Sequence, residues 1–192
     1  MRRLAAAMLL TSVTVLSAGQ HLIEGAAKSP VRVLIYEDLQ CPDCADFRQM
    51  MDTHLLPKYG ATVTFEHRDF PLAKHAWARK AAVAARYFEE TQPGLGLAWR
   101  KYAMSHQSEI SADNFDERLA QFAKQNGADP AKAAAALSDA RLAALIEKDF
   151  QEGVARGIAH TPTALVNGQP FIETFTVEEI SKAIDSELAA AK

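Results

Sequence analysis

Cys41 and Cys44 are the residues whose type and spacing most directly suggest chemistry, and only Pro42 and Asp43 separate them. Pro42 suits the first position of a helix, because the N–H that proline lacks would have no partner there. Cys41 is therefore expected at a helix N-terminus, where unpaired N–H groups and the helix dipole favour a thiolate. Two thiols at this spacing on one helical turn can close a disulfide and reopen it. The motif predicts a redox-active dithiol.

Two other roles for the cysteine pair are less well supported. A zinc site usually takes four ligands, but the chain has no third cysteine, and its six histidines lack the spacing of a zinc-binding pair. An inert structural disulfide would close a very short loop and so remove little chain entropy. We therefore expect neither a metal nor an organic cofactor.

Hydrophobic patterning predicts the elements that position the dithiol. Residues 31–36 are apolar and rich in β-branched side chains, as in a buried strand. A helix follows from Pro42 and is expected to end near Pro57. Residues 61–66 then alternate between polar and apolar types, as a second strand does. Strand, helix and strand in this order predict a βαβ unit with a parallel strand pair.

The rest of the chain divides into a helical block and a second strand region. Residues 76–156 carry hardly any strand signal and are expected to form helices. A short strand is predicted at 163–166, and Asn167-Gly168 is a strong hairpin signal that makes 170–172 its antiparallel partner. Thr176 is placed to cap a final helix. The predicted layout is βαβ, a helical block, then ββα.

A second group of candidate residues, His160, Thr161 and Pro162, lies between the helical block and the third strand. Proline cannot donate to a strand ladder, so Pro162 belongs at the start of the strand or at an edge. It is also the best candidate for a cis bond among the eight prolines, with an ordinary trans turn as the alternative. His160 either lies near Cys41, where an imidazolium would lower the thiol pKa, or is a surface loop residue.

The N-terminal residues predict an exported protein. Arg2-Arg3 precede an apolar run over 4–16 and small residues at 17–19, the order of a secretory signal peptide. We expect residues 1–19 to be that signal, with an uncleaved membrane anchor as the alternative, and residues 20–29 to be a tether. The composition is that of a soluble globular protein, 48% hydrophobic and 23% charged. A net charge of −3 offers no basic surface for nucleic acid.

Three stretches resemble the DsbA-like branch of the thioredoxin superfamily, which contains exported bacterial thiol–disulfide oxidoreductases. These stretches are 36–44 around the dithiol, 68–75 after the second strand, and 157–168 around Pro162. The resemblance implies an α/β, thioredoxin-like fold built from residues 30–75 and 157–192, with an inserted helical domain at 76–156. It also implies a periplasmic location and a membrane redox partner that recycles the dithiol.

The resemblance further implies roles for individual residues. Cys41 would be the exposed nucleophile, Cys44 its resolving partner, and Thr161 and Pro162 a cis pair beside the sulfurs that binds the client. The implied activity is exchange of the Cys41–Cys44 disulfide with client thiols through a mixed disulfide. Two alternatives remain open: a reductase or isomerase kept reduced by a membrane partner, and a peptide-binding module without a redox role.

The sequence departs from the family pattern next to the dithiol. Asp43 stands where strong oxidants of the family carry histidine, and Ile35 stands where related proteins often bury an acid. A carboxylate disfavours a nearby thiolate, so Asp43 is expected to raise the Cys41 pKa relative to a histidine version and to make a weaker oxidant. We expect a Cys41 pKa between about 3.5 and 7, the values of a strong oxidant and of thioredoxin.

Overall fold

The structure is a computed structural model that describes residues 21–192. Its sheet has the strand order β1-β3-β2-β4-β5. The strands are β1 (Leu22–Gly25), β2 (Arg32–Glu37), β3 (Thr64–Asp69), β4 (Thr163–Val166) and β5 (Gln169–Ile172). β2 and β3 are parallel and all other neighbours are antiparallel, which confirms the predicted βαβ unit and the hairpin at Asn167-Gly168.

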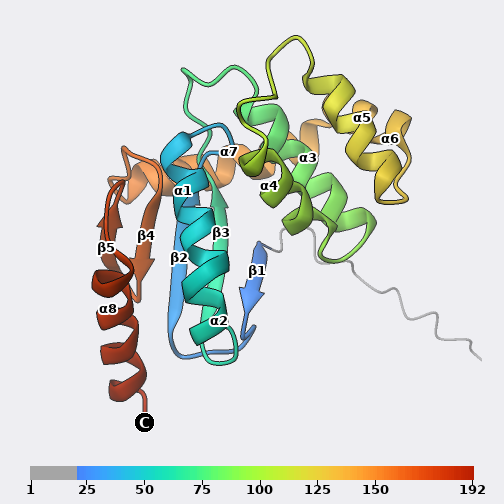
Figure 1. Cartoon of the computed structure of the whole chain (residues 1–192). Coiled ribbons are helices and arrows are strands. Elements are labelled where there is room, and N and C mark those ends of the chain that lie inside the picture. Colours follow the sequence, from blue (N-terminus) through green and yellow to red (C-terminus); the bar gives the residue numbers. More distant parts are fainter. Residues whose placement is uncertain (1–20) are drawn as a thin grey trace, which may run out of the picture.

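The helices follow the predicted order along the chain, with α1 to α8 labelled in Figure 1. They are α1 (Pro42–Met50), a π-helical stretch (Met51–Leu55), α2 (Leu56–Tyr59), α3 (Ala78–Thr91), α4 (Leu95–Ser105), α5 (Phe115–Gln125), α6 (Pro130–Ala136), α7 (Ala140–Ala155) and α8 (Val177–Ala190). Helical structure continues past the end expected near Pro57. Pro57 is the second residue of α2 and directly follows the π-helical stretch, where the hydrogen-bond pattern of the helix changes.

Helices cover both faces of the sheet. Val33 and Ile35 of β2 point toward one face and pack with Phe47 of α1 and Ile184 of α8. Alternate strand residues point to the opposite face and pack under α7. α7 approaches the sheet closely there, since a Cβ atom at Gly153 would lie 2.7 Å from the Phe70 ring. The sheet with α1, α7 and α8 forms the expected thioredoxin-like arrangement.

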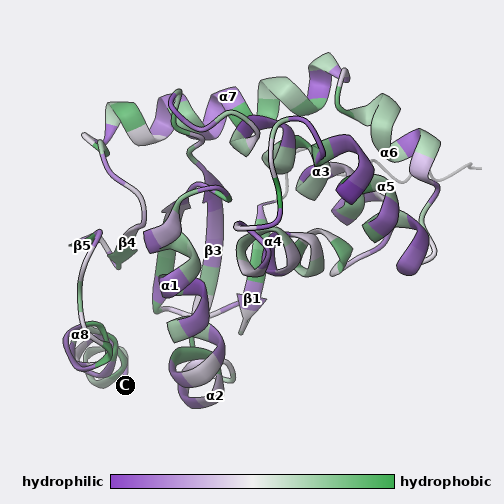
Figure 2. Cartoon of the chain, turned by 45° about the horizontal axis from the view of Figure 1, so that its top comes forward, coloured by the Kyte–Doolittle hydropathy of each residue, from purple (hydrophilic) through white to green (hydrophobic). Residues whose placement is uncertain are grey.

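α3 to α6 form a helical unit beside the sheet (Figure 1). Aromatic side chains make much of its core, among them Trp77, Phe88, Trp99, Phe115 and Phe122. Hydrophobic and hydrophilic residues alternate around the helices in Figure 2, as expected of helices that bury one side.

α7 belongs to both parts of the molecule. Leu142 and Ile146 in its first half pack with Ala82 and Val83 of α3, whereas Phe150 further along packs against the sheet. The sequence suggested a domain boundary after residue 156, at the end of α7. Because α7 packs on both the helical unit and the sheet, this boundary comes after a helix that belongs to both.

The expectation of a tether at residues 20–29 is wrong for 22–25. These residues form β1, an edge strand antiparallel to β3, and Leu22 is buried. The strand is short and contains Glu24, a residue unfavourable in strands, so its pattern gave no signal. The Glu24 carboxylate forms ion pairs with His67 and Arg48, which lie far from it in the sequence.

The expected signal peptide at 1–19 lies outside the described residues. Within residues 21–192, no helix combines the length and the apolar character needed to cross a bilayer.

Candidate functional site

The dithiol lies at the junction of β2 and α1. Cys41 caps α1 with an extended backbone, at φ −77° and ψ 125°, and Pro42 is the first helical residue as predicted. The Cys41 N–H donates to the Asp38 carbonyl at 3.1 Å, which closes a tight turn between the strand and the helix. Cys44 follows on the first turn of α1. Both thiols are free in this structure, and Cys44 is fully buried while Cys41 retains 5% exposure.

The loop before β4 brings Thr161 to the reactive sulfur. β4 runs antiparallel to β2 and pairs Thr163 with Tyr36, so the start of β4 meets the end of β2. The Cys41 thiol donates to the Thr161 carbonyl oxygen at an Sγ–O distance of 3.3 Å. The Thr161–Pro162 bond is cis. Both the cis bond and its closeness to Cys41 agree with the prediction.

The site lowers the pKa of Cys41 to about 6. The main cause is a hydrogen bond from Cys44, and partial burial opposes it. The Thr161 side chain and the backbone N–H groups of Cys44 and Asp43 lower the pKa further. The N–H contribution is that expected at a helix N-terminus. The value lies within the range expected from the sequence.

The pKa of Cys44 moves in the opposite direction. Burial raises it well above its usual value, and the hydrogen bond and charge of Cys41 add to the increase. The two sulfurs therefore differ as a nucleophile and a resolving thiol must: one ionises readily near the surface, whereas the other stays protonated until its partner reacts.

The two residues expected to tune Cys41 are differently placed. His160 lies on the surface, with 58% of its side chain exposed and its Nδ1 atom 2.9 Å from Glu173. This placement matches the surface-loop alternative, and no hydrogen bond joins His160 to Cys41 in the described part of the chain. Asp43 is exposed, and its backbone N–H lowers the Cys41 pKa. The effect of its carboxylate stays a prediction.

Asp38 organises the turn that carries Cys41, a role that patterning alone did not reveal. Its side chain is fully buried and accepts hydrogen bonds from Gln40 N at 2.7 Å, Leu72 N at 2.7 Å and His75 Nδ1 at 2.8 Å. Its own N–H donates to Cys44 Sγ at 3.4 Å. One carboxylate thus joins the active-site turn to the segment after β3. Asp38 lies within the stretch 36–44 that resembles the family, but the resemblance did not suggest these partners.

Gln107, in the loop between α4 and α5, also contacts the active-site turn. Its Nε2 donates to the carbonyl oxygens of Leu39 and Cys41, both at 2.9 Å. The sequence contains no signal for this contact, because a loop glutamine is ordinarily a solvated residue.

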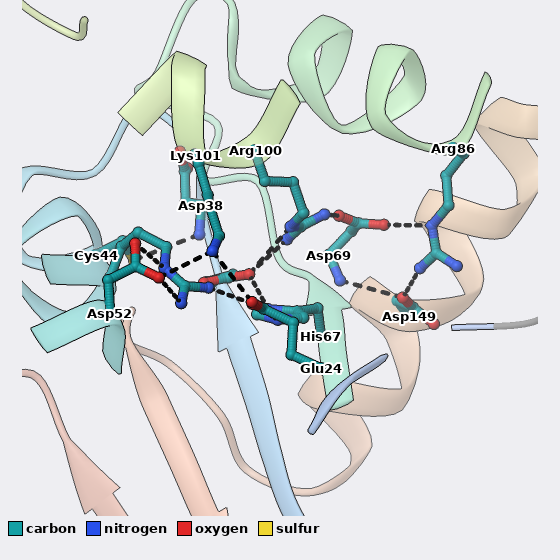
Figure 3. Close-up of polar contacts among 12 residues, drawn as sticks. Glu24, Asp38, Cys44, Asp52, His67, Asp69, Arg86, Arg100, Lys101 and Asp149 are labelled. Atoms are coloured by element: carbon teal, nitrogen blue, oxygen red, sulfur yellow. Dashed lines mark hydrogen bonds and ion pairs between the residues drawn. The ribbon is translucent and has the colours of Figure 1, made fainter. Parts of the chain in front are cut away.

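A chain of buried ion pairs connects α3, α4 and α7 with the sheet, as Figure 3 shows. Arg100 of α4 donates to Glu37 of β2 at 2.8 Å and to Asp69 of β3 at 2.5 Å. Arg86 of α3 joins Asp69 to Asp149 of α7. The helical unit is therefore held to the sheet through ion pairs, which must be complete because an unpaired buried charge is very costly.

His67 lies between the carboxylates of Glu37 and Glu24. Its Nδ1 is 2.6 Å from Glu37 and its Nε2 is 2.9 Å from Glu24, so two ionised acceptors require two N–H donors. Burial disfavours the charged ring, but the two carboxylates outweigh it and raise the His67 pKa. The Glu37 pKa falls to about 2, because His67 and Arg100 outweigh the effect of its burial. His67 is thus held as a buried imidazolium.

No cluster of three or more His, Cys, Asp or Glu side chains arranged to hold a metal ion occurs within residues 21–192.

Comparisons with known proteins agree with this geometry. The model of the family described as Thioredoxin matches residues 17–186. Among curated proteins, the Na(+)/H(+) antiporter NhaA 3 of Salinispora tropica is 28% identical over 173 residues, which cover 88% of this chain and 25% of that protein. The chain thus spans about a quarter of the length of the curated relatives it matches.

Similar solved structures include two named bacterial proteins. Oxidised BdbD from Bacillus subtilis has a TM-score of 0.74 at 22% identity, covering 88% of this chain and 93% of that one. Alpha-DsbA1 from Wolbachia pipientis has a TM-score of 0.78 at 17% identity, covering 93% and 98%. These likenesses establish the fold, and the family model spans most of the sequence. The chain therefore belongs to the thioredoxin family and has the fold of its DsbA-type members.

Proposed function

We propose that this protein is a thiol–disulfide oxidoreductase that exchanges a Cys41–Cys44 disulfide with the cysteines of client proteins. The observation that carries the proposal is the contrast between the two sulfurs. The Cys41 pKa is lowered to about 6, whereas burial raises that of Cys44. The fold of DsbA-type proteins supports the same activity.

The exchange proceeds in two balanced steps. A client thiolate attacks Cys41 Sγ of the oxidised protein, the Cys41–Cys44 bond breaks, and Cys44 leaves as a thiolate that takes up a proton. In the resulting mixed disulfide, a second client thiolate attacks the client sulfur and expels the Cys41 thiolate. The client loses two electrons and gains a disulfide, and the protein becomes a dithiol. The low Cys41 pKa makes it the better leaving group.

We propose net oxidation of clients, with a driving force between that of the strong oxidant and that of thioredoxin. A more stable Cys41 thiolate stabilises the reduced protein and makes its disulfide more oxidising. A pKa of about 6 lies between the reference values of about 3.5 and 7. Continued turnover requires reoxidation, for which we propose a membrane redox partner. We also propose that residues 1–19 direct export to the periplasm, where disulfides persist.

The test is the equilibrium of the purified protein with reduced and oxidised glutathione, followed by oxidation of a reduced client protein. We expect one disulfide per chain, an equilibrium more oxidising than that of thioredoxin, and stoichiometric transfer of the disulfide to the client. A potential at or below that of thioredoxin would instead support a reductase. The third possibility, a peptide-binding module, predicts that a Cys41→Ala/Cys44→Ala double variant keeps its cellular function.

A further inference from the structure

The active-site turn receives a contact from the helical unit that neither the dithiol motif nor the exchange mechanism requires. Gln107 lies in the loop between α4 and α5, and its Nε2 atom is 2.9 Å from both the Leu39 and the Cys41 carbonyl oxygens. A side-chain amide has two N–H groups on that nitrogen, so each carbonyl receives one. Because both partners are acceptors, the nitrogen rather than the oxygen of the amide must face the turn.

The other supports of the turn bind different groups, except at the Cys41 carbonyl, which Gln107 shares with a backbone N–H. Asp38 holds the Gln40 N–H, and the Gln40 side chain accepts from Trp77 N at 2.8 Å. The Cys41 carbonyl also accepts the first helical hydrogen bond, from Ala45 N at 3.2 Å. The Gln107 amide adds donor groups to the residue that carries the reactive sulfur.

The donors of Gln107 have an electrostatic consequence for Cys41. Carbonyl oxygens are the negative ends of peptide dipoles; one of these two belongs to Cys41, which carries the sulfur that becomes a thiolate, and the other belongs to Leu39, two residues before it. N–H groups that point at these oxygens bring positive partial charge toward them and offset their repulsion of the thiolate. The effect is larger in a buried site than in water, since the local dielectric constant is lower. Gln107 should therefore favour the ionised, reduced state of the dithiol.

We propose that Gln107 is a positioning residue that makes the Cys41–Cys44 disulfide more oxidising, by donating from the helical unit to the carbonyls of the active-site turn. This inference rests on the proposed oxidoreductase function. It identifies a residue outside the dithiol motif that affects how oxidising the Cys41–Cys44 disulfide is. Within residues 21–192, no hydrogen bond joins Gln107 to either sulfur. It acts through the backbone of the nucleophile.

The decisive test compares two substitutions of similar length with opposite expected effects. Gln107→Met removes both donors, so the Cys41 pKa should rise and the equilibrium constant for oxidising glutathione should fall roughly three- to tenfold, the range of one modest hydrogen bond. Gln107→Lys keeps N–H donors and adds a positive charge, so both quantities should move the other way. Gln121→Met is the matched control, because Gln121 Nε2 donates to Glu117 on the exposed side of α5.

A merely structural role predicts a different result. If Gln107 only supported the packing of the turn, its loss would destabilise the oxidised and reduced forms alike and leave the glutathione equilibrium unchanged. Equal values for the wild type and both Gln107 variants, or shifts of the same sign, overturn the inference while the proposed function stands. A wild type that does not exchange with glutathione overturns the function and with it the inference. If Gln107→Met cannot be purified, Gln107→Lys alone tests the inference: a more oxidising glutathione equilibrium supports it, and an unchanged or less oxidising one overturns it.

Discussion

His67 Nδ1 lies 2.6 Å from the carboxylate of Glu37, the last residue of β2 before the turn that carries the reactive cysteine. The pair joins neighbouring strands, since the parallel register sets Glu37 of β2 beside Asp69 and His67 beside Ile35. Arg100 approaches the same carboxylate from the helical unit. The end of β2 is therefore fixed by charge as well as by the sheet.

Protein stability should fall at alkaline pH because of His67. Its pKa is raised on folding, so its contribution is complete below the unfolded value of about 6.5 and is lost as pH rises through the folded value. Urea unfolding measured from pH 6 to 9 should show this decline. His67→Gln should lower stability by about 3–5 kcal/mol at pH 6 and remove much of the decline. His54→Gln, at an exposed position, should behave as the wild type.

Arg100→Met and Lys101→Met should differ sharply although the residues are adjacent. Arg100 is buried between Glu37 and Asp69, so its removal leaves two buried carboxylates short of a partner and should cost about 3–5 kcal/mol. Lys101 is 40% exposed and pairs with Asp52 and with Glu24, and Glu24 keeps His67 and Arg48 as partners when Lys101 is removed, so the loss should be about 0–1 kcal/mol. The measurement is the urea concentration at the unfolding midpoint of each reduced variant, compared with that of the reduced wild type. Equal losses would mean that the ion pairs at Arg100 do not hold the helical unit.

Thr161→Val should raise the Cys41 pKa and make the disulfide less oxidising. The Thr161 hydroxyl is buried and has no hydrogen-bond partner among the described residues while Cys41 is a thiol, so it is free to donate to the thiolate, and the Thr161 side chain lowers the Cys41 pKa. Valine keeps the shape but has no donor, so we expect a rise of up to about one unit. Thiolate absorbance against pH measures it. Thr163→Val is the control, since the Thr163 hydroxyl donates to His160 O at 2.7 Å.

Asp43→His should lower the Cys41 pKa and strengthen the oxidant. The substitution removes a carboxylate from the first turn of α1 and places an imidazole beside the thiolate. Asp46→His, further along the same helix, should have a smaller effect. Thiolate titration and the glutathione equilibrium should shift together. An unchanged or raised pKa would show that the Asp43 carboxylate does not set the direction of exchange.

Cys44→Ser should trap clients, whereas Cys41→Ser should not. With Cys44 absent, a mixed disulfide on Cys41 has no resolving thiol in the chain and accumulates. Non-reducing electrophoresis of protein incubated with a client disulfide detects the adduct. The wild type should resolve it. First alkylation at Cys44 in the reduced wild type would contradict the assignment of Cys41 as nucleophile.

The sequence alone was enough to predict the dithiol and the order of elements. Cys41 and Pro42 are recognisable because helix capping depends on neighbouring residues, and Asp129, Asp139 and Thr176 cap their helices for the same reason. The hairpin at Asn167-Gly168 is also a local signal.

Tertiary structure alone decided which distant groups surround the sulfurs. The strand order brings Thr161 to Cys41. β1 could not be predicted from its own residues, because the partner of its Glu24 is His67 of β3. The hydrophobic pattern of a segment indicates which of its residues are buried. It does not identify the partner of a buried charge, because another part of the chain supplies that partner. Hydrogen bonds such as that from Gln107 to Cys41 depend in the same way on two segments meeting, which no local pattern records.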